Sequence, residues 1–146
     1  MTTMDILRRT KAAWPSICNA SAEDKNRILS GMAGSLQAEC DAILRCNAED
    51  MDVARGHISD VMLDRLYLDK DRIDAMADSI RATVALPDHT GRILAQIDHP
   101  NGMKIYKKQV PLGLVAIIYE SRPNVTSDAA ALTIKSGNVC MLRSGK

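Results

Sequence analysis

The residues that could do chemistry gather in one short stretch of the C-terminal third: Glu120, Ser121, Arg122, Pro123 and Asn124. This stretch follows a continuous apolar run, residues 112–119, and precedes a segment with a helical pattern. Ligands of open α/β sheets bind beyond the carboxyl ends of strands, and a helix N-terminus adds free N–H groups and a positive dipole end. The stretch therefore favours anion binding, phosphate in particular. From the residues alone, an ordinary strand-to-helix turn with solvated side chains has about equal weight.

Two common phosphate-binding motifs are excluded. No G-x-G-x-x-G follows the apolar run, so the usual dinucleotide-binding fingerprint is absent. A P-loop that ended in Gly145 and Lys146 would need glycine at position 140, where the sequence has Cys140.

The cysteines do not have the spacing of a metal site. Cys18, Cys40, Cys46 and Cys140 form no C-x-x-C pair, and no histidine stands at ligand spacing from them. The cysteines lie in apolar or helical contexts, and the sequence shows no signal peptide. We therefore expect reduced thiols in a cytoplasmic protein.

Composition narrows the class of protein further. The 146 residues suffice for one domain with a core, and 46% apolar and 25% charged residues are ordinary for a globular protein. A net charge of +1 and 3% aromatic residues argue against nucleic acid as a partner. The longest apolar run is too short to span a bilayer, so no membrane association is expected.

Helical patterns fill the first two thirds of the chain. The first covers residues 4–14 and should end or kink near Pro15. The second begins at Ser21, where Asp24 suggests a capping box, and its apolar face is Leu29, Met32, Leu36, Cys40 and Ile43. Asn47 is expected to cap a short continuation that ends at Gly56. The third covers residues 69–86 and is closed by Pro87.

Strand patterns follow. Asn101 and Gly102 predict a turn, and residues 103–110 read as a strand. The apolar run 112–119 suits a parallel strand that is buried on both faces. A helix capped at residues 126–128 and ending at Gly137 should then lead to a strand at 139–142, which makes one βαβ unit with a right-handed crossover.

A long segment resembles a known family. Residues 111–126, PLGLVAIIYESRPNVT, are similar to the signature segment of the γ-glutamyl phosphate reductases, and residues 128–132, 135–138 and 142–146 continue the similarity. Weaker similarity covers residues 47–50 and 100–102. This family belongs to the aldehyde dehydrogenase superfamily, whose dinucleotide site lacks G-x-G-x-x-G. The implied fold class is α/β: N-terminal helices plus the first βαβ unit of an aldehyde-dehydrogenase-like dinucleotide-binding domain, incomplete.

The resemblance also implies a division of the chain and an activity. Residues 1–98 would be the helical part of the cofactor-binding domain, 99–111 the β-arm of an oligomerisation region, and 112–146 the first βαβ unit, without the catalytic domain. The family reduces γ-glutamyl phosphate to glutamate 5-semialdehyde and phosphate in proline biosynthesis, with NADPH as hydride donor and a cysteine thioester as intermediate. A homo-oligomer is expected for the complete protein.

The resemblance implies roles for single residues. Asn124 would help hold the oxyanion, and Arg143 would lie near the adenosine ribose of NADPH. Glu120, Ser121, Arg122 and Pro123 would line the pyrophosphate of the cofactor.

The nucleophilic cysteine of the family would lie beyond Lys146. Cys46, although followed by Asn47 and Ala48, is then a decoy and not the nucleophile, because no activating base can be assigned to it. Two alternatives stay open: a truncated, non-catalytic module that associates through its β-arm, and another acyl-reducing member of the superfamily.

Overall fold

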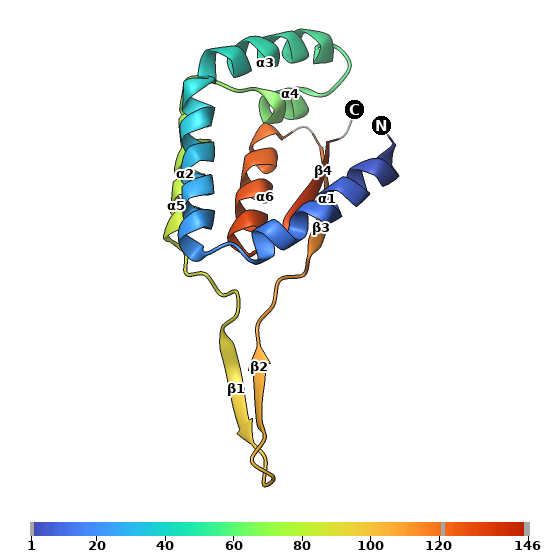
Figure 1. The fold of residues 1–146 in the computed structure, drawn as a ribbon. Helices are drawn as coiled ribbons and strands as arrows, with labels where there is room; N and C mark the ends of the chain where they lie inside the picture. The colour runs from blue at the N-terminus through green and yellow to red at the C-terminus, as the bar shows by residue number, and fades with distance from the viewer. Residues whose placement is uncertain (1, 121, 145–146) are drawn as a thin grey trace.

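The computed structural model describes residues 2–120 and 122–144. A helical body packs against a short parallel sheet, and a β-hairpin projects from it as a long arm (Figure 1). Along the chain the elements are α1 (Thr3–Cys18), α2 (Ala22–Ala38), α3 (Cys40–Ala54), α4 (Asp60–Leu66), α5 (Lys70–Ala85), β1 (Ile93–Asp98), β2 (Lys104–Lys108), β3 (Leu114–Tyr119), α6 (Pro123–Lys135) and β4 (Val139–Ser144). The predicted α/β class is confirmed.

Of the two predicted outcomes at Pro15, an end or a kink of the first helix, an end is wrong, because α1 continues through Pro15 to Cys18. Proline removes only one intrahelical hydrogen bond, because it lacks a backbone N–H, and the residues that follow it form other hydrogen bonds at the end of the helix. Asn19 donates to the Pro15 carbonyl from both its backbone N–H, at 3.2 Å, and its side-chain amide, at 2.8 Å. At the other end Thr2 and Asp5 form a capping box.

Helix α2 begins as predicted, because Ser21 Oγ accepts the backbone N–H of Asp24 at 3.0 Å. The chain then turns at Glu39, so the apolar face predicted for a single helix is divided between α2 and α3. Figure 1 shows α3 lying across the end of α2. Asn47 does not cap a continuation, as predicted, but lies inside α3, where its side chain is buried.

The core forms where α2, α5 and α6 meet. Its fully buried side chains are small or aliphatic: Leu29, Ala33, Ala77, Ile80 and Ala131. The helix predicted at 69–86 is confirmed as α5, with Asp69 Oδ1 accepting the N–H of Arg72 at 2.8 Å. Burial of a Leu or Ile side chain contributes about 1.5–3 kcal/mol, which fixes these helices against one another.

Strands β3 and β4 pair in parallel, from Leu114 opposite Val139 to Tyr119 opposite Ser144, and α6 connects them. The predicted βαβ unit is therefore present. Its helix, however, begins at Pro123 rather than at residues 126–128, because proline suits the first helical turn. The prediction that β3 is buried on both faces is also wrong, since Ile118 is 80% exposed.

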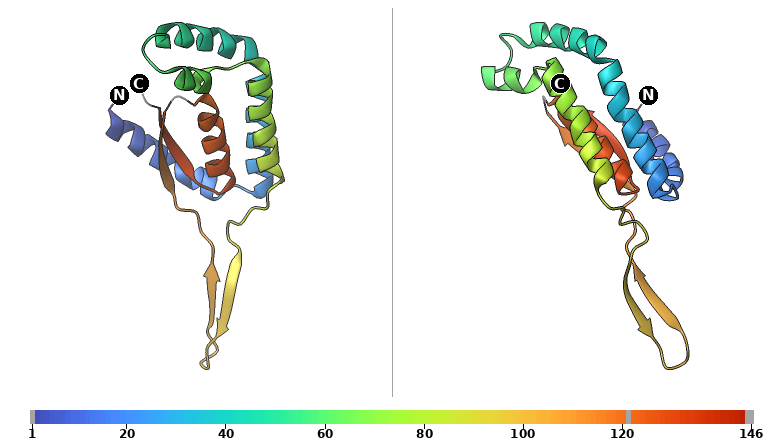
Figure 2. Two further views of the ribbon diagram at one scale, coloured as in Figure 1. Left: turned by 180° about the vertical axis from the view of Figure 1, so that it is seen from behind. Right: turned by 90° about the vertical axis from the view of Figure 1, so that its left-hand side faces the viewer.

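Strands β1 and β2 form the antiparallel arm, in which Ile97 pairs with Ile105. The predicted turn at Asn101 and Gly102 connects them, and Gly102 takes a positive φ of 85° that favours glycine. Every residue of both strands is exposed, and the arm extends away from the body in each view (Figure 2). Only β2 was predicted; β1 was missed.

Buried polar contacts fix the base of the arm to the body. Lys25, whose side chain is 1% exposed, donates from Nζ to Asp88 Oδ2 at 2.8 Å and to Thr90 Oγ1 at 3.1 Å. Asn138 Oδ1 accepts the N–H of Gly113 at 2.8 Å, just beyond the other strand of the arm. One root of the arm is thus held by α2 and the other by the α6–β4 turn.

Candidate functional site

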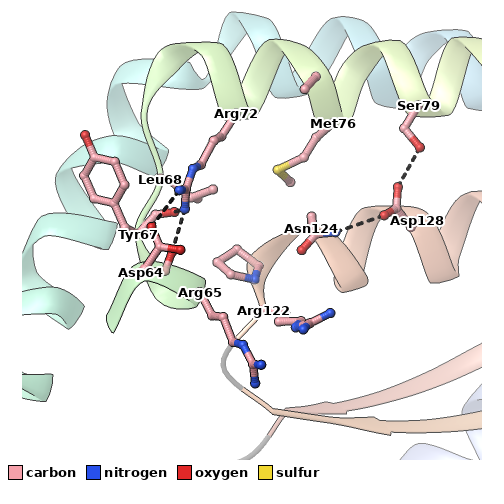
Figure 3. A pocket seen from close by; sticks show the side chains of 12 residues that line it. Asp64, Arg65, Tyr67, Leu68, Arg72, Met76, Ser79, Arg122, Asn124 and Asp128 are labelled. Atoms are coloured by element: carbon pink, nitrogen blue, oxygen red, sulfur yellow. Dashed lines mark hydrogen bonds and ion pairs between the residues drawn. The ribbon is translucent and has the colours of Figure 1, made fainter. Parts of the chain in front are cut away.

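A cleft of about 440 Å³ opens between α4, α5 and the start of α6. Figure 3 shows its side chains. The cleft is lined by polar and charged groups above an apolar floor: Asp64, Arg65, Tyr67, Leu68, Arg72, Ala75, Met76, Ser79, Arg122, Pro123, Asn124 and Asp128. The stretch that the sequence singled out therefore faces a second group of residues, from α4 and α5.

Asn124 lies in the first turn of α6 and is exposed to the cleft. Its amide Nδ2 donates to Asp128 Oδ2 at 3.2 Å, and Ser79 Oγ donates to the other oxygen of Asp128 at 2.9 Å (Figure 3). Arg122, not Asn124, occupies the N-cap position of α6. A primary amide has two N–H donors, so one donor of Asn124 is left for a ligand.

Arg72 fixes the end of α4 beside the cleft. Its guanidinium donates to the Asp64 carbonyl at 2.6 Å, to the Tyr67 carbonyl at 2.8 Å and to Asp64 Oδ1 at 2.8 Å, and it lies 5.2 Å from the centre of the Tyr67 ring. The hydrogen bond with Asp64 raises the pKa of Arg72. This pairing neutralises Asp64, so the negative charge of Asp64 is not free in the cleft.

Asn47 holds the same segment from the α3 side. Its Nδ2 donates to the Leu66 carbonyl and its Oδ1 accepts the N–H of Leu68, both at 2.8 Å. The link between α4 and α5 is thus fixed by Asn47 and Arg72 together. Arg65, in the last helical turn of α4, is therefore carried on a firmly held segment.

Arg65 and Arg122 are the cations of the cleft that no carboxylate neutralises within residues 2–120 and 122–144. Arg65 Nη1 contacts only the sulfur of Met62, at 3.8 Å, and the Arg122 side chain has no partner in that part of the chain. Both lie on the side of the cleft away from α5 (Figure 3). The cleft thus offers two guanidinium groups to a ligand.

A second cleft, of about 610 Å³, opens at the carboxyl ends of β3 and β4. Tyr119 and Ser144 line it from the strands, and Arg122 and Pro123 line it as well as the first cleft. Tyr119 and Thr126 join their hydroxyl groups at 2.5 Å, which fixes β3 to the first turn of α6. The second cleft lies where open α/β sheets bind ligands.

The structure brings only part of the predicted site together. Arg122, Pro123 and Asn124 share the first cleft. Glu120 and Arg143 are exposed at the carboxyl edge of the sheet, with Arg143 paired to Ile118 in register, but neither lines one of the two clefts described above. Ser121 lies outside the described residues.

Sequence reasoning missed the opposite wall of the cleft. Arg65 and Arg72 belong to α4 and α5, far from the stretch at 120–124 in the sequence. Helix α4 has only 7 residues, too few for a clear hydrophobic period. Its start at Ser59 followed by Asp60 was the one available signal.

Other candidate chemistry lies elsewhere. Cys46 is exposed on α3 and lines neither cleft, and the cysteines are unpaired thiols, as predicted. Within the described residues, no group of histidine, cysteine and acidic side chains could hold a metal ion. Among the described helices, none has the length and apolar character needed to cross a membrane.

Comparison with known proteins agrees with this architecture. The structure is similar to the crystal structure of γ-glutamyl phosphate reductase from Thermotoga maritima, with a TM-score of 0.94 and 34% sequence identity; the match covers 97% of this chain and 34% of that one. It is also similar to the crystal structure of γ-glutamyl phosphate reductase from Saccharomyces cerevisiae, with a TM-score of 0.92 and 32% sequence identity; this match covers 100% of this chain and 38% of that one. The fold is thus that of the corresponding part of these two structures, an incomplete α/β domain.

The sequence points to the same proteins. The chain is 59% identical over 138 residues to the γ-glutamyl phosphate reductase of Streptococcus pneumoniae serotype 19F (strain G54). No family model matches it. The match covers 94% of this chain and 33% of that relative, so the chain spans about a third of the relative's length. The chain belongs to the γ-glutamyl phosphate reductase family.

Proposed function

We propose that this chain supplies the oxyanion donor and part of the cofactor site of an enzyme that reduces γ-glutamyl phosphate to glutamate 5-semialdehyde and phosphate in proline biosynthesis. The observation that carries the proposal is the position of Asn124, in a polar cleft of a chain that is 59% identical to a reductase of that name. The free thiols of the chain are consistent with a cytoplasmic enzyme.

The chemistry needs a neutral donor where Asn124 lies. Attack on an acyl phosphate, and later hydride addition to a thioester, each place negative charge on the former carbonyl oxygen. The free N–H of the Asn124 amide can stabilise that charge without adding a cation beside the path of the hydride. The bond to Asp128 holds the amide in place, so little reorganisation is needed when the charge develops.

The carboxyl edge of the sheet fits NADPH. Arg122 borders both clefts without a protein partner in the described part of the chain, and α6 begins there without a side-chain cap. The free N–H groups at the start of α6 and the guanidinium of Arg122 would hold the pyrophosphate of the cofactor, and Glu120, Ser121 and Pro123 would line it. Arg143 would pair with the ribose 2′-phosphate. When bound, NADPH supplies the hydride.

A second candidate is an interaction module. The fully exposed arm formed by β1 and β2 favours it, because Ile97, Ile105 and Tyr106 are 58%, 42% and 45% exposed there. On this proposal the arm pairs with a second copy, as expected for a homo-oligomer. In the enzyme both roles coexist, whereas in a non-catalytic module only the arm would act.

The test is turnover in a joined reductase, in which this chain replaces the matched third of the Streptococcus pneumoniae relative. NADPH oxidation with γ-glutamyl phosphate, and the reverse reaction with semialdehyde, phosphate and NADP, should both proceed. A folded joined reductase without turnover would contradict the proposed function.

The chain by itself should show only background in the same assays, because the nucleophile is expected outside it. The control is Cys46→Ser in the joined reductase, which should keep full turnover. Turnover by the chain alone that disappears with Cys46→Ser would overturn both the inactivity and the decoy interpretation of Cys46.

A further inference from the structure

Arg65 has no role in the proposed reaction, and Asp128 has only that of holding the Asn124 amide. The two side chains differ in the sign of their charge and lie on opposite walls of the first cleft, since Arg65 comes from α4 and Asp128 from α6. We propose that this pair recognises an α-amino acid head group, with Arg65 binding the α-carboxylate and Asp128 accepting the α-ammonium of a glutamyl substrate. The assignment rests on the proposed function and deepens it.

Arg65 is available and is held in position. Its only contact with a described side chain is the long one to Met62, which is far weaker than an ion pair. The turn that carries it is fixed by Arg72 and Asn47 through hydrogen bonds of 2.6–2.8 Å to Asp64, Leu66, Tyr67 and Leu68. A guanidinium on a fixed turn can bind a carboxylate through two parallel hydrogen bonds with little loss of entropy.

Asp128 keeps acceptor capacity for a cation. Its two oxygens each accept one hydrogen bond, from Ser79 and from Asn124, whereas an ionised carboxylate offers about four acceptor positions. No cationic side chain pairs with Asp128 among the described residues. An ammonium group is the ligand that would satisfy both its charge and its free acceptor positions.

The two signs together favour the head group over a phosphate in this part of the cleft. A phosphate would gain from Arg65 but would be repelled by the carboxylate of Asp128 on the opposite wall of the cleft. An α-amino acid carries its cation and its anion on the same carbon, so it complements both walls. Asn124, hydrogen-bonded to Asp128, then lies beside the chain that leads from this head group to the reacting carbon.

The test compares aldehydes in the reverse reaction of the joined reductase. Glutamate 5-semialdehyde has both the α-ammonium and the α-carboxylate, 5-oxopentanoate lacks the ammonium, and butanal lacks both groups. Arg65→Ala should raise the KM for glutamate 5-semialdehyde about 10- to 100-fold and remove the preference for 5-oxopentanoate over butanal. Asp128→Asn, which keeps the shape, should instead remove the preference for glutamate 5-semialdehyde over 5-oxopentanoate.

Controls separate this inference from the proposed function. The KM for phosphate and for NADP should not change in either variant, and Arg27→Ala, at an exposed pair with Asp24 outside the cleft, should change none of the three constants. A raised KM for phosphate or NADP in place of the aldehyde would overturn the assignment, as would unchanged discrimination among the aldehydes.

Calorimetric binding of L-glutamate and glutarate to the same proteins keeps the inference testable without turnover. Tighter binding of L-glutamate that depends on Arg65 and Asp128 supports it even in an inactive protein. Equal binding of both ligands to the unsubstituted protein and to the variants would refute it, whatever the turnover.

Discussion

At its C-terminal end α6 is enclosed by polar partners, whereas at its N-terminal end it meets an open cleft. Lys135 Nζ, in the last turn, donates to Asn26 Oδ1 at 2.6 Å and to the Val84 carbonyl at 2.8 Å. Beyond it, Trp14 donates to the Gly137 carbonyl at 3.1 Å. At the N-cap of α6, by contrast, Arg122 has no partner in the described part of the chain.

The difference between the two ends of α6 distinguishes side chains that stabilise the fold from side chains that are available to bind a ligand. Within the described residues, every buried side-chain nitrogen and oxygen has a hydrogen-bond partner. Such satisfied groups stabilise a fold because their loss would leave a buried partner unpaired. Exposed cations such as Arg65 and Arg122, which no carboxylate of the described residues neutralises, contribute little to folding and can meet a ligand. Substitutions at the two ends should therefore have opposite signatures.

The largest effect is expected at the enclosed end. Lys25→Met removes a nearly buried cation, 1% exposed, from Asp88, which is itself only 13% exposed. Breaking a buried pair on one side costs about 3–5 kcal/mol because the remaining charge is left uncompensated. The thermal midpoint of the joined reductase should fall, while turnover per folded molecule is kept.

Arg27→Ala is the matched control, since its pair with Asp24 is exposed and such pairs contribute about 0–1 kcal/mol. Equal losses of stability in the two variants would show that the enclosed end is no more important to the fold than the surface.

The open end should respond in turnover. Asn124→Ala removes the proposed oxyanion donor, so turnover should fall about 10²–10³-fold, roughly 2.7–4 kcal/mol, with little change of the thermal midpoint. Asn138→Ala is the control at the enclosed end. It leaves the Gly113 N–H unpaired, which should cost about 1–3 kcal/mol of stability and little turnover per folded molecule. Near-normal turnover in Asn124→Ala would make Asn124 a structural residue.

A smaller effect is expected at the edge of the sheet. Arg143→Ala should raise the KM for NADPH about 10- to 100-fold and leave the KM for NADH nearly unchanged, because only NADPH carries the 2′-phosphate that a guanidinium would pair with. Arg92→Ala, at the root of the arm, is the control and should change neither constant. Equal effects of Arg143→Ala on both cofactors would place Arg143 away from the ribose.

The sequence predicted the parts that follow from local rules. Ser21 and Asp69 were readable as helix starts because a capping side chain needs only its neighbours. The βαβ unit followed from an apolar run, a helical period and a second apolar run. The candidate stretch at 120–124 was found because strand ends and helix starts attract ligands.

The rest could not be read locally. Asn47 looks like a cap in the sequence, but its amide bonds to Leu66 and Leu68, about twenty residues away, which only the fold brings near. The exposure of Ile118 depends on what covers β3, not on its own apolar neighbours. Arg65 lies in the cleft because Arg72 fixes α4 against α5. No hydrophobic period or sequence motif predicts that contact.

The smallest expected effect is a pH dependence at the enclosed end, carried by Asp88. Burial raises the pKa of Asp88, but hydrogen bonds from Lys25 and from the Thr90 backbone, with the charge of Lys25, more than offset this, so the pKa lies below that of an ordinary carboxyl. The unfolded chain titrates near the usual value for aspartate, about 3.9. Between the two values the unfolded state binds more protons than the folded state.

The stabilisation by Asp88 is therefore complete above about pH 4 and is lost as the pH falls through the lower, folded pKa. Other carboxyls also titrate there, so the informative quantity is the difference in thermal midpoint between the unsubstituted protein and Asp88→Asn. That difference should be constant from pH 7 to about pH 5 and should shrink as the pH falls below the ordinary pKa of aspartate, since protonated aspartic acid and asparagine are both neutral beside Lys25. A difference that does not change over the whole range would mean that the charge of Asp88 contributes nothing, and that Lys25 is held by hydrogen bonds alone.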